Sequence, residues 1–192
     1  MITKTHIIIL AVVAILVIQA FSLYVFLGNP LICPCGYVKL FDASVRSSEN
    51  SQHLLDWYSF SHVIYGFLLY FAGWVARKKF GWPLYVVFLL AVALSTGWEL
   101  FENTHFALHR FQINTISFDY YGDSIVNSLM DTVCMMTGFW LAWILPVWAV
   151  IVIVIGLELL VGFITRDNLL LNIIMFTHPA KAILHWQAAL SP

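Results

Sequence analysis

Long apolar stretches alternate with short polar segments along this chain. Residues 7–27 form the first stretch, which is broken only by Gln19 and Ser22, and a helix of this length can cross a hydrocarbon core of about 30 Å. Similar stretches follow at 60–75, 82–101, 124–145 and 147–164. The pattern predicts an all-α, multi-pass membrane helix bundle with five transmembrane helices, and it predicts residues 1–192 to be a single membrane domain.

The charged residues predict how these spans are oriented. Lys4 and the run Arg77, Lys78 and Lys79 flank apolar stretches without an acid nearby, and such segments stay in the cytoplasm by the positive-inside rule. The acids fall in the alternate segments, at Asp42, Glu49, Asp56, Glu99, Glu102, Asp119, Asp123 and Asp167. Five spans then place the N-terminus inside and the C-terminus outside.

Both ends of the chain allow a second interpretation. Lys4 could begin a cleaved signal peptide, but the apolar run is longer than usual for one and no A-x-A site follows it. Near the other end, residues 166–192 contain an apolar stretch at 169–176 that is too short to cross a bilayer. We expect this tail to lie along the interface as a short amphipathic helix, with a re-entrant segment as the alternative.

The composition agrees with a chain that is solvated by lipid. Hydrophobic residues make up 61% of it and charged residues 10%, and the mean hydropathy is +0.88. The formal net charge is -1, and nucleic-acid binding would require a clustered basic surface. The composition therefore predicts a membrane-lipid environment and no nucleic-acid partner.

Two cysteines lie close together in the first outward loop, at Cys33 and Cys35. An oxidising outer compartment permits disulfides, but a bridge across a single residue closes a small strained ring. The spacing therefore favours two unbonded or loosely paired thiols. The pair alone supplies too few ligands for a structural metal. Cys134 falls inside the fourth span and is expected to be a packing residue.

A polar helix face is predicted where the third span reaches the outer surface. Glu99 and Glu102 are three residues apart, and Asn103 is four beyond Glu99, so all three project from one side of the helix. His62 enters the second span at the same level. A histidine there can be a general base, a metal ligand or a polar group paired with a carboxylate.

A second polar face follows the fourth span. Asp123, Asn127 and Asp131 are spaced by four residues, and ionisable groups within a span normally face the bundle interior or a wet cavity. Glu158 lies eight residues before Arg166, just as Asp131 lies eight after Asp123. We expect the two acids at similar depth, where their proximity would raise the pKa of at least one of them and could leave the pair sharing a proton. The alternative is that each acid is neutral and hydrogen-bonded separately.

Several segments resemble a proteobacterial inner-membrane family catalogued as uncharacterised protein family 0314, or domain of unknown function 2585. They are Leu31-Ile32-Cys33, Cys35-Gly36-Tyr37-Val38-Lys39-Leu40, Ser48-Glu49-Asn50-Ser51-Gln52-His53, residues 119–127, Arg166-Asp167-Asn168-Leu169 and Leu171-Asn172-Ile173-Ile174-Met175. The resemblance implies a multi-pass protein of the bacterial inner membrane with a periplasmic C-terminus. It implies no activity and no catalytic residues.

A looser likeness is to VanZ-like membrane proteins. It depends on the order of an acid, an arginine, an aspartate, an asparagine and a glycine, matched here by Glu99, Arg110, Asp119 or Asp123, Asn127 and Gly138. Where that family often places Gln after the acid, this chain has Glu102. The likeness implies a function linked to the cell envelope, but a shared architecture does not supply a reaction.

Two functions agree with these residues equally well. The first is a membrane-embedded hydrolase or transferase acting on a lipid or lipid-linked envelope substrate. Its catalytic or metal-ligating residues would be Asp123, Glu99, Glu102 and His62, and its substrate-binding residues Arg110, Asp119, Asn127 and Arg166. Carboxylates beside a histidine can hold a divalent metal or divide acid and base roles without one. The second function is a non-catalytic lipid-binding or membrane-complex assembly factor, and the sequence leaves this choice open.

Two further possibilities carry less weight. An aspartic-peptidase arrangement would pair Asp119 or Asp123 with Asp131 or Glu158, and it requires two carboxylates too close for both to ionise. A small transporter is disfavoured by the five predicted spans and by the lack of an internal repeat.

Overall fold

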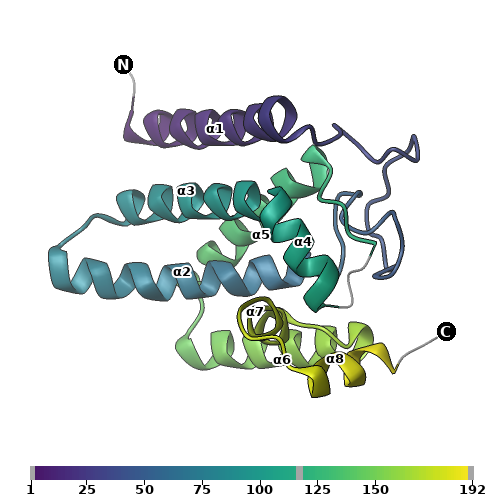
Figure 1. The fold of residues 1–192 in the computed structure, drawn as a ribbon. Helices are drawn as coiled ribbons and strands as arrows, with labels where there is room; N and C mark the ends of the chain where they lie inside the picture. Colours follow the sequence, from purple (N-terminus) through teal and green to yellow (C-terminus); the bar gives the residue numbers. More distant parts are fainter. Residues whose placement is uncertain (1–2, 116–118, 190–192) are drawn as a thin grey trace.

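Five long helices carry most of the chain (Figure 1). They are α1 (Lys4–Ser22), continued by the π-helical turn η1 (Leu23–Leu27), and α2 (Ser59–Phe80), α3 (Leu84–Glu102), α5 (Ile125–Ile144) and α6 (Val147–Thr165). This computed structural model describes residues 3–115 and 119–189. Each of the five helices is long and apolar enough to cross a membrane. The predicted all-α, multi-pass bundle is therefore confirmed.

The helix bounds follow from local sequence signals. Pro83 and Pro146 are the N-caps of α3 and α6, because proline is tolerated where helical N–H groups have no partner. Helix α2 continues to Phe80, beyond the predicted end at residue 75, and stops where Gly81 has a φ of 70°. The extra turn is basic, and the Lys78 ammonium lies 3.9 Å from the centre of the Trp74 ring. Long basic side chains can cover apolar surface in this way while their charge reaches water.

Helices α2 and α5 form the most extensive helix contact of the bundle. Two glycines allow their backbones to approach closely. A Cβ atom added at Gly66 would lie 2.1 Å from the Met135 carbonyl oxygen, and one added at Gly138 would lie 2.0 Å from the Val63 carbonyl oxygen. Small residues permit this kind of close crossing between membrane helices. The approach fixes the relative positions of the polar side chains that α2 and α5 carry one or two turns away.

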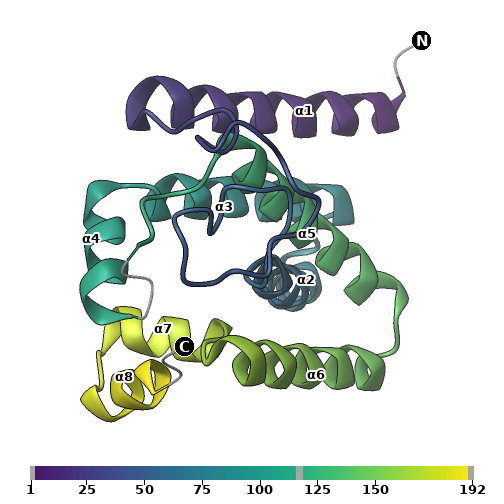
Figure 2. The same cartoon turned by 90° about the vertical axis from the view of Figure 1, so that its right-hand side faces the viewer.

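The remaining helices are short and gather at one end of the bundle, which we call the loop end. They are α4 (His105–Asn114), α7 (Leu169–Thr177) and α8 (Lys181–Ala188). Helix α4 was not predicted. Figure 2, viewed from the loop end, shows α4, α7, α8 and the loop of residues 28–58 around the end of α2. The opposite end, which carries Arg77, Lys78 and Lys79, is called the basic end.

The predicted interfacial tail forms two helices, α7 and α8, and its residues 190–192 lie outside the described ranges. Figure 1 shows α7 almost along its axis while α2 runs across the view, so α7 lies crosswise to α2. Helix α7 packs against α4. These two helices therefore cover part of the loop end.

Helices α1 and α6 expose most of their apolar side chains. Only 11% of the apolar stretch of α1 and 6% of the apolar stretch of α6 are buried within the protein. Figure 2 views α2 nearly end-on but shows α1 and α6 from the side, so both cross α2 obliquely. Such exposed apolar surfaces are compatible with contact to membrane lipid.

Candidate functional site

A cavity of about 170 Å³ lies at the loop end, between α2, α3 and α5 and the shorter helices α4 and α7. The polar residues in its wall are Asn50, Ser51, Tyr58, Ser61, His62, Glu102, Tyr120, Asp123, Asp131 and Asn172. Its apolar side chains are Tyr65, Trp98, Phe111, Leu169 and Ile173. The cavity greatly exceeds the 10–15 Å³ or so that one water molecule requires. It can therefore hold several waters or part of a larger ligand.

His62 lies between two carboxylates that come from neighbouring helices. Its Nδ1 atom is 3.3 Å from Glu99 Oε1 on α3, and its Nε2 atom is 3.9 Å from Asp131 Oδ2 on α5. The three residues are at most 8% exposed. Ser59 Oγ donates a 2.8 Å hydrogen bond to the other oxygen of Asp131. The imidazole thus connects α3 and α5 across the wall of the cavity.

His62, Glu99 and Glu102 bring three potential metal ligands together. One ligand atom from each lies within 4.8 Å of the others. Among the described residues, His62 Nδ1 and Glu99 Oε1 are buried without a hydrogen-bond partner, whereas Ser128 Oγ donates a 2.7 Å bond to the other Glu99 oxygen. One imidazole and two carboxylates form a suitable ligand set for a borderline or hard divalent cation. The two unpaired atoms, 3.3 Å apart, are the ones such a cation would bind.

Asp123 lines the cavity and is held by hydrogen bonds on every side. Its carboxylate accepts bonds of 2.6 Å from Asn103 Nδ2 and 2.9 Å from Tyr120 Oη. Its N–H donates to Asn103 Oδ1, and its carbonyl oxygen accepts from Asn29 Nδ2. Burial raises the pKa of Asp123, while the bonds from Asn103 and Tyr120 oppose this rise. Asp123 is therefore fixed in place as a carboxyl group whose proton affinity is increased.

Asp56 belongs to the same buried group of acids, although the sequence did not single it out. Its Oδ1 atom accepts hydrogen bonds from the N–H groups of Tyr58 and Ser59 at the start of α2. Burial raises the pKa of Asp56 to about 6, and the negative charge of Asp123 adds to this rise. An aspartate just before an apolar helix is a typical N-terminal capping signal. The position of Asp56 at the start of α2 could therefore have been predicted from the sequence.

Asn127, a predicted substrate-binding residue, does not line the cavity. Its side-chain amide donates a 2.8 Å hydrogen bond to the His53 carbonyl oxygen and a 3.4 Å bond to Asp56 Oδ2. Asn127 therefore connects α5 to the loop of residues 28–58.

A network around Gln19 supports the acids from behind. Gln19 is fully buried on α1, where its amide N–H donates to Ser128 and its amide oxygen accepts from Thr96 and Thr132. Ser128 in turn donates to Glu99. A single amide within an apolar run signals such an interhelical contact. The Gln19 network fixes the orientation of Glu99 from α1.

Three predicted substrate-binding residues also lie outside the cavity wall. Both Arg110 Nε and Nη2 donate to the Phe176 carbonyl oxygen, the first at 2.9 Å. The Arg166 guanidinium lies 4.7 Å from the centre of the Trp186 ring, and Asp119 is exposed. Arg110 and Arg166 therefore fasten α7 and α8 to the rest of the loop end.

The predicted pairing of Glu158 with Asp131 is wrong. The two Glu158 oxygens accept hydrogen bonds of 3.2 and 3.3 Å from the N–H groups of Leu169 and Leu170 at the start of α7. A helix N-terminus favours a carboxylate because its first N–H groups have no partner within the helix. The alternative, separate hydrogen bonding of each acid, is the observed arrangement. Asp131 accepts a hydrogen bond from Ser59 instead.

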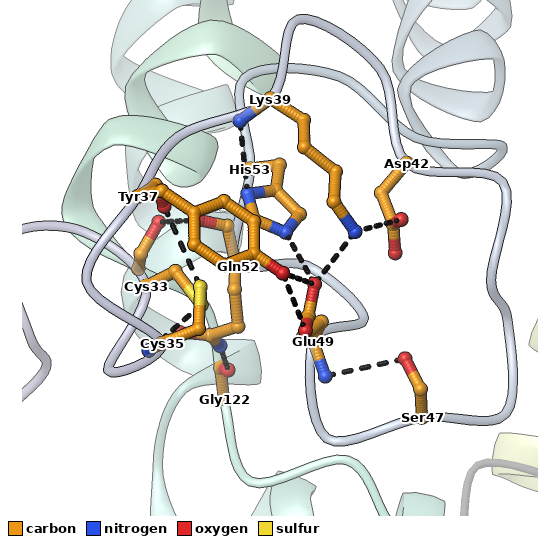
Figure 3. The surroundings of a disulfide bond; sticks show 11 residues. Cys33, Cys35, Tyr37, Lys39, Asp42, Ser47, Glu49, Gln52, His53 and Gly122 are labelled. Atoms are coloured by element: carbon orange, nitrogen blue, oxygen red, sulfur yellow. Dashed lines mark hydrogen bonds and ion pairs between the residues drawn. A yellow bond between two sulfur atoms is a disulfide. The ribbon is translucent and has the colours of Figure 1, made fainter.

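Cys33 and Cys35 are joined by a disulfide, contrary to the expectation of unbonded thiols. Figure 3 shows the bond in the loop of residues 28–58, beside a group of polar side chains that we call the loop cluster: Tyr37, Lys39, Asp42, Glu49 and His53. The N–H of Gly36 donates to the Cys33 carbonyl oxygen at 3.0 Å. This closes a tight turn around the pair and brings the two cysteines together.

Comparisons with known proteins support the resemblance seen in the sequence. The family model described as Protein of unknown function (DUF2585) matches residues 24–189. A UPF0314 protein of Sinorhizobium fredii is 47% identical over 187 residues, which cover 97% of this chain and 93% of the relative. One of Rhizobium etli is 48% identical over 178 residues, 92% of this chain and 89% of the relative.

A third relative is similar to this chain to the same degree. A UPF0314 protein of Paracoccus denitrificans is 46% identical over 166 residues, which cover 85% of this chain and 84% of the relative. None of these matches supports the likeness to VanZ-like membrane proteins, and no solved structure gives a significant match. By the extent of the family match and the identity to its bacterial members, the chain belongs to the DUF2585 family, the UPF0314 proteins.

Proposed function

We propose that this chain is a membrane-embedded hydrolase that uses a divalent metal, held by His62, Glu99 and Glu102, to act on a lipid or lipid-linked substrate at the periplasmic face of the inner membrane. The observation that carries the proposal is the meeting of three ligand atoms within 4.8 Å at the wall of a cavity. His62 and Glu102 line that cavity. A metal with three protein ligands and one side open to a cavity is the usual arrangement of a catalytic site.

The surrounding charges favour a cation at this position. In the described part of the chain, His62 is the only basic residue paired with Glu99 or Asp131, and its imidazole carries a charge only when it is protonated. Several buried carboxylates without a cation cost free energy unless they bind protons, a metal or a cationic group. Two glutamates would balance the charge of one divalent ion. A bound divalent ion would thus explain why these buried carboxylates are not paired with a lysine or an arginine.

Asp131 is placed to orient the imidazole. A histidine that binds a metal through one ring nitrogen usually directs the other toward a carboxylate. Here Nδ1 faces Glu99 and Nε2 faces Asp131, 3.9 Å away. Because Ser59 fixes the Asp131 carboxylate, Asp131 acts as a positioning residue for His62.

Asp123 is the best-placed general base. A bound divalent ion lowers the pKa of a coordinated water and so supplies a nucleophile near neutral pH. Asp123 lines the same cavity as Glu102, and its raised pKa increases its affinity for a proton. A base is most effective when its pKa approaches the working pH. Asp123 would accept the proton of the attacking water and return it to the leaving group.

The apolar part of the wall suits a lipid. Trp98 on α3 and Leu169 and Ile173 on α7 face the same cavity as the acids. A substrate with an apolar chain and a polar group at its end would place the chain against these residues and the scissile bond near Glu102. This combination of apolar wall and few polar groups is typical of small-molecule sites.

The position of the basic end supports the location of the cavity at the periplasmic face. Arg77, Lys78 and Lys79 lie at the opposite end of the bundle from the cavity, and basic residues remain in the cytoplasm. A reporter that is active only outside the cytoplasm should work when fused after Arg46 or Asn114 and fail after Lys79. Activity after Lys79 together with silence after Asn114 would invert the orientation.

Activity can be tested with the full chain in lipid nanodiscs. Inner-membrane lipid extract is added with Mn²⁺ or Zn²⁺ or with a chelator, and the products are followed by mass spectrometry. We expect metal-dependent hydrolysis that Glu102→Gln reduces by at least about 100-fold, in the range for loss of a catalytic group. Asp119→Asn, an exposed acid near the site, is the matched control and should retain activity. Metal binding without turnover of any lipid would support the assembly-factor alternative instead.

A further inference from the structure

The disulfide loop holds two sulfur atoms that differ in their access to solvent. Cys33 is 3% exposed, whereas Cys35 is an exposed residue. Thiol–disulfide exchange begins when a thiolate attacks a disulfide sulfur, so access decides which sulfur is attacked. Cys35 therefore holds the sulfur that an incoming thiol would reach more readily. Cys33 would then be the leaving group.

The backbone of the loop is arranged to receive both sulfur atoms after reduction. The N–H of Cys35 points at Cys33 Sγ at 3.1 Å, and a hydrogen bond of this kind stabilises a thiolate. Cys35 Sγ lies 3.5 Å from the Tyr37 carbonyl oxygen, which can accept the weak hydrogen bond of a thiol. Each sulfur therefore has a suitable partner in the dithiol state.

The loop cluster keeps this geometry independent of the disulfide. Lys39 Nζ lies 2.6 Å from Glu49 and 3.0 Å from Asp42, and His53 Nε2 lies 3.0 Å from the same Glu49 oxygen that pairs with Lys39. Tyr37 Oη also donates to Glu49 (Figure 3). These contacts tie together the segment that follows the cysteine turn. Before the turn, the carbonyl oxygens of Pro30 and Leu31 accept hydrogen bonds from the N–H groups of Ile125 and Val126. Opening the disulfide would leave the loop folded.

His53 places an ionisable ring beside the sulfur atoms. One of its ring nitrogens lies within 4.8 Å of both Cys33 Sγ and Cys35 Sγ, and the residue is 1% exposed. Its Nδ1 atom accepts from the Lys39 N–H at 3.2 Å. The ring is thereby held in one orientation by Lys39 and Glu49, next to the bond that would open.

From this arrangement we infer that the Cys33–Cys35 pair is a thiol–disulfide exchange site for an external dithiol, with Cys35 as the sulfur that is attacked. The inference is separate from the proposed hydrolase, because neither cysteine lines the cavity. In the first step a thiolate of the dithiol attacks Cys35 Sγ, the Cys33–Cys35 bond breaks, and its electron pair leaves on Cys33. In the second step the other thiolate of the dithiol attacks its own sulfur in the mixed disulfide, and Cys35 is released. The external dithiol is oxidised to a disulfide and this chain is reduced to a dithiol, with protons taken up from water.

The test uses the full chain in detergent with Cys134 replaced by Ala in every sample, so that only the loop cysteines react. Folded protein is treated with dithiothreitol or with a peptide that carries two cysteines, and free thiols are alkylated and counted by mass spectrometry. We expect both reagents to open the disulfide while circular dichroism stays unchanged. Faster reaction with the peptide would identify a protein as the source of the dithiol, and faster reaction with dithiothreitol a small molecule.

Single-cysteine variants test which sulfur is attacked. With oxidised glutathione, Cys33→Ser should form a mixed disulfide at Cys35 at least about 10-fold faster than Cys35→Ser forms one at Cys33, because Cys35 is the more exposed residue. The same two variants in denaturant should react at equal rates, which controls for intrinsic reactivity. Glu99→Gln in the cavity should leave the rate of disulfide opening unchanged. A disulfide that opens only after unfolding, or equal rates for the two folded variants, would overturn the inference.

Discussion

The loop cluster and the acids of the cavity lie at the same end of the bundle, but their charges are balanced in different ways. In the loop cluster, Glu49 has a lysine, a histidine and a tyrosine within 2.6–3.0 Å. In the described part of the cavity, the only basic side chain beside Glu99 and Asp131 is the His62 imidazole, 3.3 and 3.9 Å away. Lys39 first, then His53 and Tyr37, lower the pKa of Glu49 to about 2. Burial raises the pKa of Asp56 to about 6.

This difference distinguishes acids whose ionised form stabilises the fold from acids whose burial costs folding free energy. The loop cluster draws stability from its ionised carboxylate, because that carboxylate has partners. The cavity acids are buried without a permanent cation, and natural structures retain such groups mainly where they serve a function. The comparison therefore favours the cavity over the loop cluster as the metal site.

The largest expected effect comes from the scaffold that brings the cavity acids together. Gly138→Ala would place a Cβ atom 2.0 Å from the Val63 carbonyl oxygen, so α2 and α5 would have to separate. Overpacking of this kind costs about 3 kcal/mol or more when backbone is displaced. Thermal unfolding in detergent should show the loss.

Gly156→Ala on α6 is the matched control, since the described residues of other parts of the chain leave open space around the added Cβ. It should leave the melting temperature level or raise it slightly, because alanine has the higher helix propensity. Equal behaviour of the two variants would mean that the α2–α5 approach does not determine the cavity.

Neutralising a cavity acid should stabilise the metal-free protein. In Glu99→Gln the new amide can donate to the unpaired His62 Nδ1, 3.3 Å away, while the remaining oxygen still accepts from Ser128. Satisfying two buried polar atoms and removing a buried charge should gain about 1–3 kcal/mol in unfolding free energy. Denaturation in the presence of a chelator measures it. A loss of stability would show that the charged Glu99 holds the bundle together.

The stability contributed by Asp56 should depend on pH in a defined direction. Its pKa is raised from 3.8 to about 6, so the folded state binds the proton more tightly than the unfolded state. This contribution is fully present below about pH 4 and is lost as the pH rises through 6. The unfolding free energy of Asp56→Asn, measured relative to that of wild type, should therefore rise by on the order of 1–3 kcal/mol between pH 4 and pH 7. A difference that does not change with pH would contradict the raised pKa.

Glu49 should show the opposite and smallest effect. Its pKa is lowered from 4.5 to about 2, so its stabilisation is present above pH 4.5 and is lost as the pH falls through 2. Glu49→Gln should lower the melting temperature slightly at pH 7 and not at pH 2, because surface ion pairs contribute little. A higher melting temperature of Glu49→Gln at pH 7 would contradict the difference between the loop cluster and the cavity acids.

The hydrophobic pattern was sufficient to predict the five spans, because lipid requires about 20 consecutive apolar residues for each. The spacing of Glu99, Glu102 and His62 also indicated that these side chains share one level, and the structure brings one ligand atom of each within 4.8 Å of the others. Helical period and span direction fix depth, so such groupings can be read from sequence. Helix α4 was missed, because its ten residues form no apolar run.

Partners that depend on tertiary contact could not be predicted. The bond of Arg110 to the Phe176 carbonyl and that of Glu158 to the start of α7 join segments whose packing no periodicity specifies. The Cys33–Cys35 disulfide was unexpected, because ring size alone argues against it. Its formation depends on the turn closed by Gly36 and on the loop cluster around it.

The central claim is that the cavity binds a divalent metal through His62, Glu99 and Glu102. It is tested most directly by the melting temperature of the purified chain as Mn²⁺ or Zn²⁺ is titrated, in wild type, Glu99→Gln and Asp119→Asn. At a metal concentration of about 100 times the dissociation constant, binding to the folded state adds about 2.7 kcal/mol of stability. Wild type and Asp119→Asn should show this gain, and Glu99→Gln, although more stable without metal, should show none. An equal gain in all three proteins, or none in any, would contradict the metal site.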